Sequence, residues 1–89
     1  MHVGERWYIV QHAYYHYVGT ITSILGPKHV TLKDCVRVHS CSRNFTGFFD
    51  DGFKNDTVYT HWPDDTECSG WIVAAPFPHP IPEKKKKSS

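Results

Sequence analysis

Apolar residues gather in short runs along this chain instead of recurring at helical intervals. Residues 5–12 are rich in aromatic and β-branched side chains, and apolar residues occupy both odd and even positions. Successive side chains of a strand point to opposite faces, so this run predicts a strand that is covered on both sides. Aromatic residues make up 15% of the sequence. Together these features predict an all-β domain.

A β-hairpin is predicted from residues 14–33. Residues 14–24 have strand character, and Gly19 within them predicts a bulge or a close approach of two backbones. The turn residues Gly26, Pro27 and Lys28 follow. Residues 29–33 then alternate strictly between apolar and polar side chains, which is typical of the second strand of a hairpin.

We expect a bend at Asp34 and a continuing strand over residues 35–39. Its alternation predicts Val36 and Val38 inward, with Cys35, Arg37 and His39 outward.

The second half of the chain is less regular. Residues 40–56 predict a long, partly packed loop, in which the spacing of the phenylalanines permits a short helical turn. Residues 57–62 and 71–75 are further strand candidates. Four prolines at alternate positions after residue 75 predict an extended segment that docks on a neighbouring subunit or covers the sheet edge of its own protomer. We expect one domain over residues 1–83 and a disordered basic tail over 84–89.

Charge and cysteine content narrow the class of protein. The net charge of +1 depends on the terminal lysines, since residues 1–83 hold six Lys and Arg against nine Asp and Glu, a net of −3. An acidic domain argues against a nucleic-acid partner, because such a partner requires a basic face. Three cysteines without a CxxC pair suggest reduced thiols, and neither a membrane span nor a signal-peptide pattern occurs. A soluble cytoplasmic protein is expected, and its marginal core favours a homo-oligomer.

The strand pattern resembles two groups of proteins. Residues 18–23 followed by 29–38 are similar to the G-T-I-x-S and V-T-L strands of SH3-like and Sm-like small barrels. A wider set of positions, Ile9-Val10, Gly19-Thr20-Ile21, Val30-Thr31-Leu32 and Arg37-Val38, resembles short uncharacterised bacteriophage proteins with a proline-rich end. The chain departs from that group after Val38. The expected fold is therefore a small antiparallel SH3-like or Sm-like barrel with a long loop and an extended proline-rich C-terminal segment.

The phage resemblance implies a small oligomeric protein that counters host defence. Such a protein would act in the host cell cytoplasm, either by gripping a host protein or by sequestering a nucleotide signal. The resemblance therefore leaves two functional hypotheses open, a ligand-sequestering protein and a protein-interaction inhibitor or structural phage component with an aromatic surface. Sm-like RNA binding is a third.

A cluster of tyrosines and histidines over residues 11–17 is the strongest indication of a binding site. Their rings can stack on a base while their polar tips bind a ribose or phosphate. Arginine side chains can bind phosphate bidentately. The alternatives are core or strand-surface tyrosines, and arginines paired with aspartates. We predict that a small nucleotide-like ligand contacts His12, Tyr14, Tyr15, His16, Arg37, His39 and Arg43.

A few histidine and cysteine residues have spacings that could suit a metal site. His39 and Cys41 have the i, i+2 spacing of a ligand pair, with Cys35 on the same strand face. Histidines on the strand surface and ordinary buried thiols explain these residues better, so no metal or cofactor is predicted. No strand-to-helix turn or glycine-rich loop is present to position a nucleophile, and we predict that the chain is not an enzyme.

Overall fold

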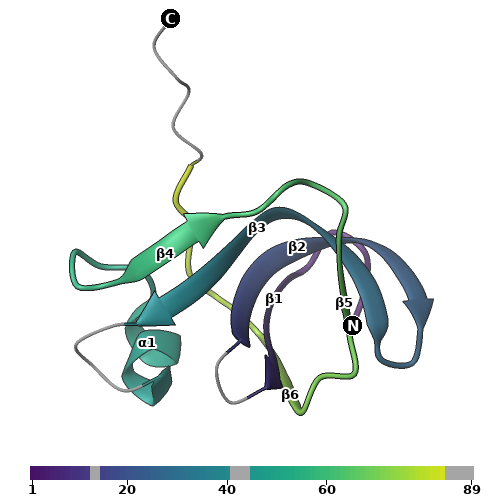
Figure 1. The fold of residues 1–89 in the computed structure, drawn as a ribbon, viewed down its shortest axis with the longest axis horizontal. Coiled ribbons are helices and arrows are strands. Elements are labelled where there is room, and N and C mark those ends of the chain that lie inside the picture. Colours follow the sequence, from purple (N-terminus) through teal and green to yellow (C-terminus); the bar gives the residue numbers. More distant parts are fainter. Residues whose placement is uncertain (13–14, 41–44, 84–89) are drawn as a thin grey trace, which may run out of the picture.

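The computed structural model describes residues 1–12, 15–40 and 45–83 of the 89-residue chain. Within them the chain forms a mostly antiparallel β domain with one short helix, as the residue runs predict (Figure 1). The elements in order are β1 (Arg6–His12), β2 (Tyr15–Gly26), β3 (His29–Ser40), α1 (Phe45–Asp51), β4 (Val58–His61), β5 (Thr66–Ser69) and β6 (Val73–Pro76).

The strands form one sheet in the order β4-β3-β2-β1-β6, and β5 also pairs with β3. β4 lies along residues 36–40 of β3, whereas β5 lies along residues 29–32. All of these pairings are antiparallel. The described strands do not close the sheet by hydrogen bonding, so the antiparallel sheet is confirmed and the barrel stays a prediction.

The predicted hairpin joins β2 and β3 through a turn at Pro27 and Lys28. Gly19 lies in β2 where the backbone passes close to β3. A Cβ built on Gly19 would lie 3.0 Å from the Cβ of Leu32, which is tighter than normal packing. The backbone of Gly19 is therefore in close contact with the Leu32 side chain, and the pairing register of β2 with β3 shifts at this position.

β3 contains a bulge at Asp34, whose φ is 52°. The register of β2 against β3 shifts between Val18 and Thr20, opposite Asp34 and Cys35. The extra residue bends the strand without interrupting it. Cys35 is fully buried, so its predicted outward position was wrong. The prediction failed because side chains pack on both faces of the sheet here.

Two hydrophobic cores lie on opposite faces of this sheet. Neighbouring residues of β1 contribute to different cores, because strand side chains alternate between the faces. We call the first the Ile9 core, which contains Ile9, Tyr17, Ile21, Val30, Leu32, Cys35, Cys68 and Trp71. We call the second the Tyr8 core, which contains Tyr8, Val10, Val18, Val38, Phe48 and Phe77.

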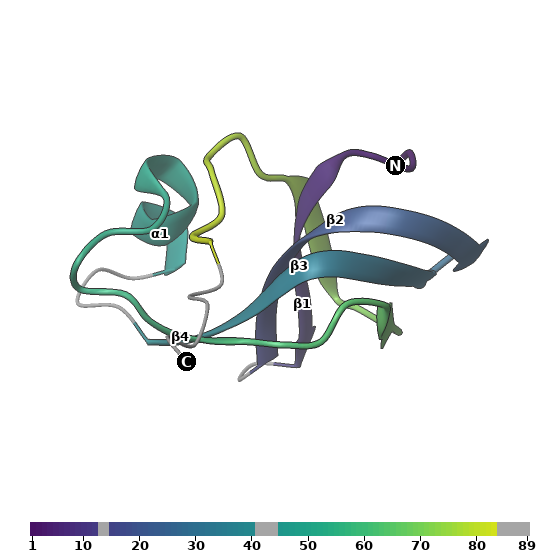
Figure 2. The same cartoon turned by 90° about the horizontal axis from the view of Figure 1, so that it is seen from above.

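Helix α1 covers the Tyr8 core, and Figure 2 shows it beside the C-terminal segment on one side of the sheet. Phe48 is fully buried there, while Phe45 and Phe49 pack against the core from the same helix. Gly52 follows the helix with a φ of 79°, and its N–H donates to the carbonyl of Phe48 at 2.7 Å. No helix in the described residues has the length and hydropathy needed to cross a membrane.

The chain continues from β6 through residues 77–83 without a helix or strand. Phe77 is only 2% exposed and belongs to the Tyr8 core. The guanidinium of Arg6 donates to the carbonyl of His79. The Nε2 atom of His79 lies 3.0 Å from the carbonyl oxygen of Phe49. These contacts place the segment against its own sheet and helix.

Candidate functional site

Arg37 and Tyr15 meet on the side of the sheet that carries the Ile9 core. Tyr17 of β2 pairs with Arg37 of β3, and Tyr15 shares a face with Tyr17 because it lies two residues away. The Cζ atom of Arg37 lies 4.4 Å from the centroid of the Tyr15 ring. This is a cation–π contact. Tyr15 is 38% exposed, so the contact lies at the surface.

The guanidinium of Arg37 is only partly satisfied. Its Nε atom is buried and has no hydrogen-bond partner among the described residues. Nor does any carboxylate of the described chain lie within ion-pair distance of Arg37. A guanidinium offers five N–H donors in a planar fork. Arg37 can therefore present donors to an anion while the Tyr15 ring supports it.

His39 extends this surface along β3. Thr60 of β4 pairs with Arg37, and the Oγ1 atom of Thr60 lies 2.7 Å from the Nε2 atom of His39. His39 is exposed. We call Tyr15, Arg37, His39 and Thr60 the Arg37 surface. It brings together three of the residues predicted from the sequence and adds Thr60.

His16 lies on the opposite face, in contact with the Tyr8 core. It is 7% exposed, and its Nδ1 atom lies 2.6 Å from the hydroxyl of Tyr8. Its ring stacks on Phe45 with a centroid distance of 3.6 Å. His16 is therefore part of the packing between the sheet and α1, and it does not join the Arg37 surface.

The other predicted ligand-binding residues are assigned neither to the Arg37 surface nor to the Tyr8 core. The backbone of His12 pairs with Tyr15 at the end of β1, and its side chain is not described. Tyr14 and Arg43 lie outside the described residues, as do Cys41 and the tail over residues 84–89.

An apolar groove of about 440 Å³ lies between α1 and the edge of the sheet. Among its lining side chains are Tyr8, His16, Phe45, Phe49 and Val73. Val73 belongs to the edge strand β6 and is 50% exposed. The groove is suited to an apolar or aromatic group.

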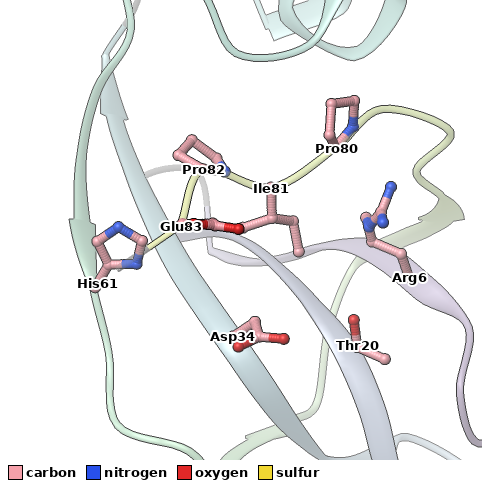
Figure 3. Close-up of a pocket in the computed structure, with 8 residues that line it drawn as sticks. All are labelled: Arg6, Thr20, Asp34, His61, Pro80, Ile81, Pro82 and Glu83. Carbon is pink, nitrogen blue, oxygen red and sulfur yellow. The ribbon is translucent and has the colours of Figure 1, made fainter. Parts of the chain in front are cut away.

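A second pocket, of about 320 Å³, lies on the face of the sheet that carries the Tyr8 core, farther along the strands than the groove (Figure 3). Its floor is a row of polar residues, Arg6, Thr20, Asp34 and His61, from the neighbouring strands β1, β2, β3 and β4. Residues 80–83 form the opposite wall. We call this the Arg6 pocket.

Sequence reasoning missed the Arg6 pocket, although one indication was present. Arg6 shares a strand face with Tyr8 and Val10, and Thr20 shares one with Val18, so polar residues occupy positions that alternation turns toward the core. Recognising that these polar residues form one row across the strands also required the pairing of Arg6 with Thr20.

The two described cysteines are buried in the Ile9 core. Loss of hydration raises the pKa of Cys35 to about 12 and that of Cys68 to about 11. Both are protonated thiols at neutral pH, and thiols are weak nucleophiles and metal ligands. Cys35 does not meet the exposed His39. The described residues contain no group of three His, Cys, Asp or Glu side chains arranged to hold a metal.

Comparison with protein-family models, with curated proteins and with solved structures finds no match to this chain.

Proposed function

We propose that this chain is a small phage-type binding protein that sequesters a phosphate-bearing ligand, such as a nucleotide immune signal, and so counters host defence. The observation that carries the proposal is the Arg37 guanidinium, which stacks on Tyr15 at 4.4 Å and has no carboxylate partner among the described residues. The proposal assigns no chemical step to the chain.

The chemistry of the Arg37 surface fits a phosphate. A guanidinium fork binds two phosphate oxygens at once, and such charge-assisted hydrogen bonds are about twice as strong as neutral ones. The electron-rich face of the Tyr15 ring attracts the guanidinium and so favours its position over the ring. His39 can add a further N–H donor at the same strand end.

The proposal includes a homo-oligomer of small SH3-like or Sm-like barrels. The meander from β1 to β4, the return of β6 to β1 and the bulge at Asp34 support this type of barrel. The phage setting has only the sequence resemblance as support. Subunit association would stabilise a domain of this size.

Calorimetry with a panel of linear and cyclic nucleotides tests this function. At least one nucleotide should bind, and Arg37→Gln should raise its Kd about tenfold or more because charge-assisted hydrogen bonds are lost. Lys33→Gln is the matched control, since it removes one positive charge from the same strand at an exposed position. Failure of every nucleotide to bind, or an equal loss in both variants, would contradict the proposal.

A second candidate function is inhibition of a host protein through an aromatic surface. The apolar groove beside β6 favours it, since Val73 lines the groove from the edge strand and is 50% exposed. Apolar surface next to an edge strand is suited to an extended peptide. Under this alternative, Val73→Lys would abolish recovery of a stoichiometric partner from host lysate, and Arg37→Gln would leave recovery unchanged.

A further inference from the structure

The Arg6 pocket holds charges of both signs that do not pair with one another. Arg6 lines it from β1, Asp34 from the bulge in β3, and Glu83 from the C-terminal segment. Within the described chain, neither carboxylate lies within ion-pair distance of Arg6. Figure 3 shows Arg6 on one side of the pocket and Glu83 with His61 on the other.

The position of Arg6 is fixed, yet its hydrogen bonding is incomplete. One terminal nitrogen, Nη1, donates to the carbonyl of His79. The Nε atom is buried and finds no acceptor in the described part of the chain. A buried donor without an acceptor is unfavourable by about 1–3 kcal/mol. An anionic group bound in the pocket would balance the charge of this guanidinium, which no carboxylate of the described residues contacts.

Asp34 lines the pocket from a left-handed backbone conformation. Its φ is 52°, and its N–H donates to the Oδ1 atom of Asp64 at 3.1 Å. A residue other than glycine in this region costs about 1–3 kcal/mol, and such residues cluster at binding sites. The bulge therefore maintains an unfavourable conformation at the residue that contributes a carboxylate to the pocket.

We infer that the Arg6 pocket binds a small zwitterion, whose carboxylate contacts Arg6 and whose ammonium group contacts Asp34 and Glu83. A phosphate-rich ligand would face two carboxylates, and a simple cation would leave the charge of Arg6 without an anionic partner among the described residues. The volume of about 320 Å³ lies at the lower end of ligand pockets, which favours a small ligand. Thr20 and His61 offer further hydrogen bonds along the floor.

An amide NMR titration with γ-aminobutyrate, butyrate and butylamine tests the inference. γ-Aminobutyrate should shift the amide signals around Arg6, Thr20 and Asp34, because it carries both charges. Butyrate and butylamine should each bind about tenfold more weakly, since each lacks one charge-assisted contact.

The matched variants are Asp34→Asn and Asp65→Asn. Both positions have positive φ, at 52° and 63°, and asparagine accepts this conformation, so both variants should fold. Asp34→Asn should weaken γ-aminobutyrate binding about tenfold, and Asp65→Asn should not change it. The inference is overturned if γ-aminobutyrate leaves these amides unshifted, if butylamine binds as tightly, or if both variants behave alike.

Discussion

The two faces of the sheet each carry an arginine whose Nε atom is buried without an acceptor in the described chain, yet the surroundings differ. Arg37 lies on an exposed surface against Tyr15, with no carboxylate in contact among the described residues. Arg6 lies in a pocket that it shares with Asp34 and Glu83. The same side chain is thus suited to a phosphate on one face and to a zwitterion on the other.

The faces also differ in how each site is built. The Arg37 surface consists of residues on the paired strands β2, β3 and β4. The Arg6 pocket needs residues 80–83 as a wall, and the aromatic Tyr8 core lies beneath the start of that segment. Damage to the Tyr8 core should therefore affect the Arg6 pocket first.

The largest expected effect comes from Phe77→Ala. The Phe77 ring is 2% exposed and packs near Phe48, with a centroid distance of 5.4 Å. Its removal should lower the free energy of unfolding by about 3–5 kcal/mol, as measured by denaturant titration. Among molecules that remain folded, γ-aminobutyrate binding should be lost and nucleotide binding retained.

Ile72→Ala is the control for this variant. Ile72 is 67% exposed, so its truncation should change stability by less than about 0.5 kcal/mol. Equal destabilisation by the two substitutions, or loss of both binding activities together in folded Phe77→Ala protein, would remove the distinction between the faces.

Alkaline pH should act on the Ile9 core through its thiols. Burial raises the pKa of Cys35 and Cys68 from an ordinary 9.0 to about 12 and about 11. The folded chain therefore holds these protons to a higher pH than the unfolded chain. The two thiols contribute fully to the free energy of unfolding below about pH 9. This contribution falls as the pH rises toward the folded pKa values, by about 1.4 kcal/mol per thiol near pH 10.

Denaturant titrations across this pH range measure the loss. Cys68→Ala should show a shallower decline above about pH 9 than the parent chain, because one shifted thiol is gone. Parallel declines would mean that these thiols do not control alkaline stability.

Arg37→Lys should lower nucleotide affinity by a smaller factor, because it changes the shape of the cationic group and keeps its charge. Lysine keeps the positive charge but loses the planar fork and its stacking on Tyr15. Nucleotide affinity measured by calorimetry should fall about five- to tenfold, less than for Arg37→Gln. Unchanged affinity would show that Arg37 acts only as a point charge.

Tyr15→Leu should give the smallest effect. A surface cation–π contact contributes about 0.5–1 kcal/mol, so nucleotide Kd should rise about two- to fivefold. Tyr15→Phe keeps the aromatic ring and should stay close to the parent protein in the same calorimetric assay. Equal losses in both variants would assign the effect to the hydroxyl group.

The local pattern of apolar and polar residues was sufficient to predict much of the fold. Alternation predicted the hairpin of β2 and β3, and phenylalanine spacing permitted the turn that became α1. β5 was missed because Thr66–Ser69 is short and polar, and its strand character depends on distant pairing with β3. β6 begins at Val73 instead of residue 71, because β1 determines where pairing starts.

The candidate sites required information that local pattern does not contain. Tyr15 and Arg37 were predicted to act together and do meet, whereas the adjacent His16 points to the other face. Alternation separates Tyr15 from His16, but only the register of β2 against β3 shows which of the two shares a face with Arg37. The Arg6 pocket depends on the register of four strands and on residues far away in sequence.

The most direct test is an amide NMR titration of one sample series with the tightest-binding nucleotide and, separately, with γ-aminobutyrate. We expect the nucleotide to shift signals of Tyr15, Arg37 and His39, and γ-aminobutyrate to shift those of Arg6, Thr20 and Asp34. Arg37→Gln should raise the Kd reported by the first set of shifts about tenfold or more and leave the second set unchanged. A nucleotide that shifts the Arg6 pocket, or one that leaves the Arg37 surface unshifted, would contradict the assignment of phosphate binding to Arg37.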